Sequence, residues 1–222
     1  MKELIGRDFG VKVLDTLTGF KWIGRKITRY EKVLREKIAA ETGLAIDYDQ
    51  IPLNFRRQWL LRHSTAYVFG GEESYGYLAS DRVRDKDGNA AVLLFVELIA
   101  ALKVEGKTVW QYLEELYVRY GYYLEGQINQ YYEGASGSLK ITNILKSYRN
   151  RPPVQIGGYE VKRVIDFGKE EIHDEDGEGI PTQDFFVVEL KNGFRYAVRG
   201  SGTEPKIKFH LFGQGELGSA AR

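Results

Sequence analysis

Seven residues between two predicted strands have the side chains that a phosphate-binding loop needs. They read Arg199-Gly200-Ser201-Gly202-Thr203-Glu204-Pro205. Glycines let successive backbone N–H groups converge on an anion, the hydroxyls of Ser201 and Thr203 add donors, and the Arg199 guanidinium supplies a planar charged fork. Lys208, in the next predicted strand, adds a further cation. An ordinary connection between strands has the same composition, so these residues alone leave both interpretations open.

A second polar group follows a predicted buried strand at residues 66–69. Glu72, Glu73 and Ser74 come directly after two glycines. In open α/β sheets, ligands commonly bind at the carboxyl ends of the strands, and carboxylates beside a hydroxyl suit a polyol. Adjacent acidic residues in a loop are more often solvated, however, and these residues alone favour that interpretation.

Two further features have a functional and a plain structural interpretation. Lys21 lies between Phe20 and Trp22, which suits a cation directed into a cleft but favours a surface lysine whose stem covers apolar rings. The stretch at 173–178, His-Asp-Glu-Asp-Gly-Glu, resembles a metal-binding loop. It lacks the alternation and the closing glutamate of an EF-hand, so we interpret it as a solvated acidic turn and predict no metal site.

The composition argues against several classes of function. The 222 residues include 32 Lys and Arg against 31 Asp and Glu, a net charge of +1, so no overall field attracts nucleic acid or an anionic membrane. Without cysteine there are no disulfides, no cysteine-ligated zinc and no thiol catalysis. The longest apolar run, residues 90–102, includes Glu97 and is shorter than the roughly 20 residues that span a bilayer. Residues 1–15 lack the apolar core of a signal peptide, so we expect a cytoplasmic protein.

The hydrophobic pattern predicts an α/β unit in the first part of the chain. The expected elements are buried strands at 11–14 and 66–69 and helices at 20–43, 90–104, 108–120 and 138–149. Asp87-Gly88-Asn89 supplies the N-cap chemistry for the strongly apolar helix predicted at residues 90–104. Because it is apolar apart from Glu97 and Lys103, we expect that helix to be buried.

Beyond residue 150 the hydrophobic period changes to two, which is typical of strands. Asn192-Gly193 is a strong signal for a two-residue hairpin. The expected strands are 161–167, 184–191, 194–198 and 206–212. Pro152-Pro153 lies in the best candidate linker, residues 150–158. We therefore predict an α/β domain at 1–150 followed by a small α+β domain with an antiparallel sheet at 151–222.

Four segments, taken in order, resemble the motifs of the α-D-phosphohexomutase superfamily. They are Thr18-Gly19-Phe20-Lys21, Gly71-Glu72-Glu73-Ser74-Tyr75-Gly76, Arg84-Asp85-Lys86-Asp87-Gly88 and Arg199-Gly200-Ser201-Gly202-Thr203-Glu204-Pro205. The resemblance covers nearly all of the chain, which is similar to the C-terminal half of that family's four-domain enzyme: most of the third domain and most of the fourth. The Glu-Glu-Ser-Tyr form of the sugar loop resembles phosphoglucomutases and phosphopentomutases more than phosphomannomutases.

The resemblance implies an isomerase that interconverts sugar 1-phosphates and 6-phosphates, or 5-phosphates for a pentose, through a phosphoserine and a bisphosphorylated sugar. The glucose phosphates are then its expected substrate class. The resemblance further implies that Glu72 and Ser74 bind sugar hydroxyls and that Lys21 contacts the substrate and assists proton transfer. It implies phosphate binding by Arg199, Ser201, Gly202, Thr203 and Lys208. For the full-length enzyme it implies Mg²⁺ and a sugar bisphosphate activator.

Two motifs of that family do not occur in this sequence. They are its phosphoserine loop, Thr-Ala-Ser-His-Asn-Pro, and its magnesium loop, Asp-Gly-Asp-x-Asp-Arg, both of which belong to the family's first two domains. We therefore expect a chain that is truncated at both ends, needs N-terminal domains as partners, binds no cofactor and is inactive alone. The alternative is a stand-alone phosphosugar-binding or regulatory module, while the net charge disfavours an aromatic-rich nucleic-acid binder.

Overall fold

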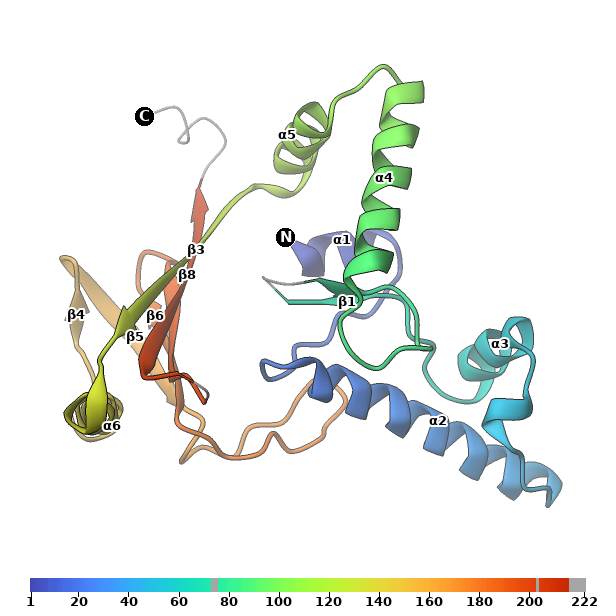
Figure 1. Cartoon of the computed structure of the whole chain (residues 1–222), viewed down its shortest axis with the longest axis horizontal. Coiled ribbons are helices and arrows are strands. Elements are labelled where there is room, and N and C mark those ends of the chain that lie inside the picture. The colour runs from blue at the N-terminus through green and yellow to red at the C-terminus, as the bar shows by residue number, and fades with distance from the viewer. Residues whose placement is uncertain (73–75, 203, 216–222) are drawn as a thin grey trace. The chain divides into compact units, whose positions relative to one another are not determined.

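The computed structural model describes residues 1–72, 76–202 and 204–215, and its contacts divide the chain into two compact units (Figure 1). The sheet unit comprises Met1–Asp15 and Trp110–Arg222, and the helical unit comprises Thr16–Val109. Three of the four motifs therefore belong to the helical unit. The arginine-glycine-serine motif belongs to the sheet unit.

Helix α2 (Phe20–Thr42) dominates the helical unit and confirms the long helix predicted there. Gly19 precedes it with a φ of +115° and Gly43 ends it in the left-handed region at +72°, a conformation that glycine adopts without a Cβ clash. The start of α2 is anchored by a small core in which Phe20 and Ile27 pack with Leu78. This core joins the first turns of α2 to the segment that follows the second motif.

The helical unit contains little sheet. Its other elements are η1 (Tyr48–Gln50), α3 (Leu53–His63), β1 (Gly70–Gly71), β2 (Tyr77–Leu78) and α4 (Gly88–Val104). β1 and β2 pair antiparallel, with Gly70 opposite Leu78. The buried strand predicted at 66–69 is wrong: no described residue pairs with it, and Val68 and Phe69 are 49% and 54% exposed. An apolar run becomes a strand only where backbone partners are available, and here they are available only to the two glycines.

Helix α4 forms where the sequence predicts it, but the prediction that it is buried is wrong. Asp87 caps it by accepting hydrogen bonds from the N–H groups of Asn89 and Ala90, each at 3.0 Å. Leu102 is its one buried residue, whereas Leu93 is 61% exposed and Val96 is 53% exposed. An all-round apolar helix is normally covered. The exposed side chains of α4 therefore form an apolar surface on this chain.

This surface predicts a measurable affinity for apolar dyes. The Leu93→Lys/Val96→Lys variant is expected to enhance the fluorescence of anilinonaphthalene sulfonate much less than the wild-type chain, because it breaks up the exposed patch. Its free energy of unfolding should change by no more than about 1 kcal/mol, since neither side chain is buried. Dye fluorescence and urea unfolding measure the two effects. Equal dye binding by both proteins would contradict this account of α4.

The sheet unit is built on six antiparallel strands. In spatial order they are β3 (Tyr122–Tyr131), β8 (Lys206–Gly215), β7 (Arg195–Gly200), β6 (Phe185–Leu190), β5 (Tyr159–Asp166) and β4 (Gln155–Ile156). β6 and β7 form the hairpin predicted at Asn192-Gly193, where Gly193 has a φ of +88°. Helix α6 (Gly134–Asn150) covers one face, with Leu145 packed in a core that includes Phe186 and Ile207 (Figure 1).

The grouping of residues around the sheet differs from the boundary predicted between 150 and 151. β3 lies before that boundary, yet it pairs with β8 along its whole length, from Tyr122 opposite Gly215 to Tyr131 opposite Lys206. α6 also precedes the boundary and packs on the sheet. Long-range pairing of this kind leaves no local signal in a sequence. Division of the chain into domains at 1–150 and 151–222 stays a prediction.

The sheet unit also contains two helices, α1 (Lys2–Asp8) and α5 (Val109–Tyr120), and it lacks one strand that the sequence predicts. Helix α1 has no counterpart among the predicted elements, whereas α5, which lies in this unit except for its first residue, confirms the helix predicted at 108–120. The strand predicted at 11–14 is wrong, since no described residue pairs with it. Instead, the ammonium group of Lys12 binds the carboxylate of Asp176 at 2.7 Å. That contact takes the place of a ladder of backbone bonds.

Candidate functional site

The arginine-glycine-serine loop is the connection between β7 and β8. The backbone N–H of Ser201 donates to the carbonyl of Lys206 at 2.9 Å, and the N–H of Lys206 donates to the carbonyl of Glu204 at 2.7 Å. Ser201 is half-buried and Gly202 is exposed, while Thr203 lies outside the described residues. The structure thus brings four of the five predicted phosphate-binding residues to one end of two paired strands.

Two cations of this group stand opposite each other in the sheet. Arg199 on β7 pairs with Lys208 on β8, and directly opposite residues in an antiparallel sheet project from the same face. Val198 alternates with Arg199 and packs in the core under α6, so the two cations project from the other face. Like charges placed directly opposite each other destabilise a sheet unless an anion lies near both.

Arg199 also has unused hydrogen-bonding capacity. Its Nε atom is buried and has no hydrogen-bond partner among the described residues. A buried donor without a partner costs roughly 1 to 3 kcal/mol. Within the described part of the chain, neither Arg199 nor Lys208 forms an ion pair with a carboxylate. An oxyanion at this position would satisfy the donor and offset the repulsion.

Lys206, at the first position of β8, links the end of the loop to β3. Its side chain is 10% exposed, forms an ion pair with Glu204 and donates to the hydroxyl of Tyr131 at 3.1 Å. The bond to Glu204 raises the pKa of Lys206 above its usual value, so this lysine stays charged. The sequence signal for Lys206 is weak. It is a lysine at the first position of a strand whose apolar residues, Ile207, Phe209 and Leu211, alternate with polar ones.

The second motif begins at β1 and faces the start of α2. The carboxylate of Glu72 accepts a hydrogen bond from the backbone N–H of Gly19, which belongs to the first motif. Ser74 lies outside the described residues. At Gly71 a Cβ would lie 2.5 Å from the Tyr77 ring, so a side chain there would force that ring to move. A carboxylate has further acceptor capacity beyond one bond, which leaves Glu72 able to bind a hydroxyl group as well.

Lys21 lies in the first turn of α2 and is exposed. Its Nζ atom is 5.1 Å from the centre of the Trp22 ring, and the Arg25 guanidinium is 5.7 Å from the same ring. Lys86, from the third motif, lies 5.9 Å from the centre of the Phe20 ring. Exposed cations therefore surround the N-terminus of α2, where the helix dipole also favours anions.

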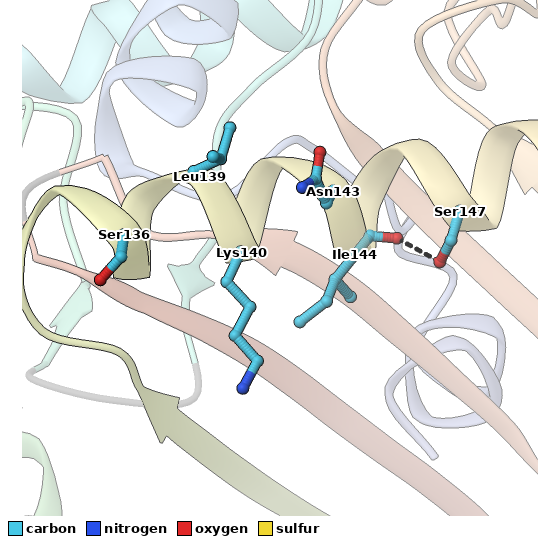
Figure 2. Close-up of a pocket in the computed structure, with 6 residues that line it drawn as sticks. All are labelled: Ser136, Leu139, Lys140, Asn143, Ile144 and Ser147. Atoms are coloured by element: carbon cyan, nitrogen blue, oxygen red, sulfur yellow. Dashed lines mark hydrogen bonds between the residues drawn. The ribbon is translucent and has the colours of Figure 1, made fainter.

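The other features considered as sites carry no comparable arrangement. No cluster of three or more His, Cys, Asp or Glu side chains suited to a metal ion occurs among residues that the structure describes. The acidic turn predicted to be solvated instead receives Lys12, and the Asp176 side chain is only 18% exposed. The six residues labelled in Figure 2 line a pocket along α6, where the Ser147 hydroxyl already donates to the carbonyl of Ile144 at 2.7 Å. None of the predicted site residues lines this pocket.

Comparison with known proteins agrees with the family that the motifs resemble. Residues 58–120 match the family model of phosphoglucomutase/phosphomannomutase, alpha/beta/alpha domain III. A probable phosphomannomutase from Haemophilus influenzae is 39% identical over 150 residues, which is 67% of this chain. A phosphoglucomutase from Staphylococcus haemolyticus is 36% identical over 156 residues, 68% of this chain. The chain belongs to the α-D-phosphohexomutase superfamily.

The match covers only part of these superfamily members: this chain aligns with 28% of the length of each of the two relatives. A solved phosphoglucomutase, the exocytosis-sensitive phosphoprotein pp63/parafusin from Paramecium in its open form, is 19% identical and has a TM-score of 0.44. That alignment covers 82% of this chain and 31% of the other, and the likeness is too low to support an inference. No helix in the described ranges is long and apolar enough to cross a bilayer.

Magnesium does not fit the described residues of this superfamily member. A hard cation needs a set of oxygen ligands, commonly with several carboxylates, and the described part of the chain offers no such set. Asp176 of the acidic turn is engaged with Lys12. No step of a reaction is therefore assigned to a metal on these residues.

Proposed function

We propose that this chain supplies the sugar-recognising and phosphate-binding part of a phosphoglucomutase-like enzyme. The enzyme would interconvert the 1-phosphate and 6-phosphate of a hexose, or the 1-phosphate and 5-phosphate of a pentose. One observation carries the proposal: Arg199 and Lys208 stand opposite each other on one face of the sheet, without carboxylate partners among the described residues, beside a loop rich in glycine and hydroxyl groups. Magnesium and a sugar bisphosphate activator belong to the proposed full-length enzyme.

Each unit has its own part in this proposal. In the sheet unit, Arg199 donates charge-assisted hydrogen bonds to the phosphate that is not reacting, with Lys208, Ser201, Gly202 and Thr203 as further donors. In the helical unit, Glu72 and Ser74 bind sugar hydroxyls, and Lys21 holds or transfers a proton at the reacting oxygen. Fixed positioning and charge stabilisation are what phosphoryl transfer requires of a protein.

The chain alone is expected to show no mutase activity, with or without Mg²⁺ and a sugar bisphosphate. No segment of the sequence matches the phosphoserine motif of the superfamily, so the phosphoryl group has no covalent carrier. A coupled assay of glucose 6-phosphate formation from glucose 1-phosphate measures this. Turnover that copurifies with the chain through several columns, and disappears in the Arg199→Ala variant, would contradict the expectation.

Glu72→Gln is expected to bring the affinities for glucose 1-phosphate and mannose 1-phosphate to within about threefold of each other. A threefold difference in affinity corresponds to roughly the free energy of one neutral hydrogen bond. The amide still accepts from the N–H of Gly19, so the loop keeps its anchor. It loses the charged acceptor that distinguishes hydroxyl geometry. Amide chemical shifts during titration at millimolar ligand measure the affinities, and inorganic phosphate is the control whose binding should not change. An unchanged sugar preference would contradict the assigned role of Glu72.

A further inference from the structure

One face of α2 holds the loop that carries the third motif. Gly24, Thr28 and Glu31 are spaced by four and three residues and therefore share that face. A Cβ at Gly24 would lie 3.0 Å from the carbonyl oxygen of Arg84, so the missing side chain permits the close approach. The guanidinium of Arg84 donates to the hydroxyl of Thr28 at 2.6 Å and to the carboxylate of Glu31. These contacts fix the backbone and the side chain of one residue.

In the ion pair between Glu31 and Arg84, the carboxylate is buried and the guanidinium is partly exposed. Glu31 is 6% exposed as a residue, and the Arg84 side chain is 35% exposed. The hydrogen bond to Glu31 raises the pKa of Arg84. A carboxylate this deeply buried is costly unless a cation compensates it. The pair therefore holds the Arg84 side chain against the third turn of α2.

Through Arg84, this pair reaches the loop of the second motif. The N–H of Asp87, three residues further, donates to the carbonyl of Tyr77 at 2.9 Å. Tyr77 ends the loop that begins after Gly71, and Glu72 at its start accepts from Gly19, the residue that precedes α2. Both ends of the segment 72–77 are thus tied to α2. Glu72 is bonded to Gly19, directly before the N-terminus of α2. Tyr77 is bonded to Asp87, and Arg84, three residues earlier in the chain, is bonded to the third turn of α2.

We propose that Glu31 is a positioning residue for sugar recognition, acting through Arg84 to fix the end of the segment 72–77. It does not touch the ligand in this role. The inference rests on the proposed function, because it assumes that Glu72 binds the sugar. It assigns a task to a buried acidic residue that lies outside all four motifs.

Hydrogen exchange of the 222-residue chain without ligand tests the first step. Glu31→Gln keeps the size of the side chain but removes its charge, and it is expected to speed exchange of the Asp87, Asn89 and Ala90 amides about tenfold. Glu36→Gln is the matched control: it lies on the same helix and breaks an exposed pair with Lys32, whose side chains are 62% and 68% exposed. Equal exchange in both variants would overturn the proposal. If Glu31→Gln fails to fold, Thr28→Val, which removes one bond to Arg84, should produce the same pattern to a smaller degree.

Titration with glucose 1-phosphate, followed by amide chemical shifts, tests the second step. Glu31→Gln should weaken binding about tenfold and leave binding of inorganic phosphate unchanged, a selectivity that a general loss of structure would not produce. Arg84→Met should weaken it equally, and the double variant should be no weaker than either single one. If the wild-type chain binds glucose 1-phosphate and the Glu31→Gln and Glu36→Gln variants bind it with equal affinity, this inference alone is contradicted. No binding by the wild-type chain would contradict the proposed function and this inference with it.

Discussion

The Arg199→Ala variant is expected to bind glucose 1-phosphate, mannose 1-phosphate and inorganic phosphate at least about thirtyfold more weakly than the wild-type chain, a loss of roughly 2 kcal/mol or more. The loss should be similar for the three ligands, because the guanidinium contacts the phosphate that they share. The buried Nε atom without a partner and the opposed Lys208 are what an anion would satisfy. Amide chemical shifts of residues 199–208 during titration measure the three affinities.

Arg195→Ala is the matched control for this experiment. Arg195 lies on the same strand, and its guanidinium is 5.2 Å from the Phe212 ring, away from the glycine-rich loop. Arg199→Lys should fall between the wild type and Arg199→Ala, since lysine keeps the charge but loses the planar fork. Equal losses in the Arg195→Ala and Arg199→Ala variants would contradict a phosphate site at the loop.

Stability separates a binding role from a structural one. Without ligand, Arg199→Ala should unfold at the same urea concentration as the wild type or a higher one, because it removes a like charge opposite Lys208. Saturating phosphate should stabilise the wild type and not the variant, as expected for a ligand that binds only the folded state. A variant that is much less stable without ligand would indicate that Arg199 supports the fold instead.

The local signals in this sequence were sufficient for most of the elements. Asp87 caps α4 through its own side chain, and Asn192-Gly193 turns the chain between β6 and β7. Both depend on one or two residues and their immediate neighbours, so they can be recognised without knowing the fold. The four motifs likewise identified the superfamily, because each is a short string of side chains.

Features that depend on distant partners could not be predicted. β3 has alternating polar and apolar residues, but only its pairing with β8, more than seventy positions later in the sequence, makes it a strand of this sheet. The strands predicted at 11–14 and 66–69 fail for the opposite reason, since apolar residues there find no ladder partner among the described residues. The exposure of α4 is a third case. Hydropathy indicates that an apolar helix tends to be buried, but it does not indicate which surface buries it.

The candidate site divides in the same way. The residues that bear charge or hydroxyl groups were evident from the sequence, and their roles stay predictions. Lys206 and Glu31 were missed because their importance lies in burial, which a single lysine or glutamate does not reveal. The opposition of Arg199 and Lys208 depends on strand register. One residue of slip would place the two cations on different faces.

Arg149→Ala is expected to lower the free energy of unfolding by about 3 kcal/mol. Arg149 lies at the end of α6 and donates from Nε to Oδ2 of Asp166 at 2.7 Å and from Nη2 to Oδ1 at 3.0 Å. The Asp166 side chain is 12% exposed, so the variant leaves a largely buried carboxylate without its cation. Urea unfolding measures the loss.

Two variants test whether the loss comes from this pair. Arg163→Ala removes a cation whose pair with Glu170 is 58% and 36% exposed, and it should cost less than about 1 kcal/mol. Adding Asp166→Asn to Arg149→Ala should restore part of the stability, because the buried charge is then absent. A double variant less stable than Arg149→Ala would contradict this interpretation.

The pH dependence of the loss follows from the same contact. Hydrogen bonds from Arg149 hold the pKa of Asp166 below its ordinary value of 3.8. A carboxyl group whose pKa is lower in the folded state stabilises the fold above its ordinary pKa, and this contribution disappears as the pH falls through the folded-state value. The difference in stability between the wild type and Arg149→Ala should therefore be largest near neutral pH and should narrow progressively below about pH 4. A difference that stays constant down to about pH 2 would assign the effect of Arg149 to its packing over the Phe186 ring, 5.4 Å away, rather than to its charge.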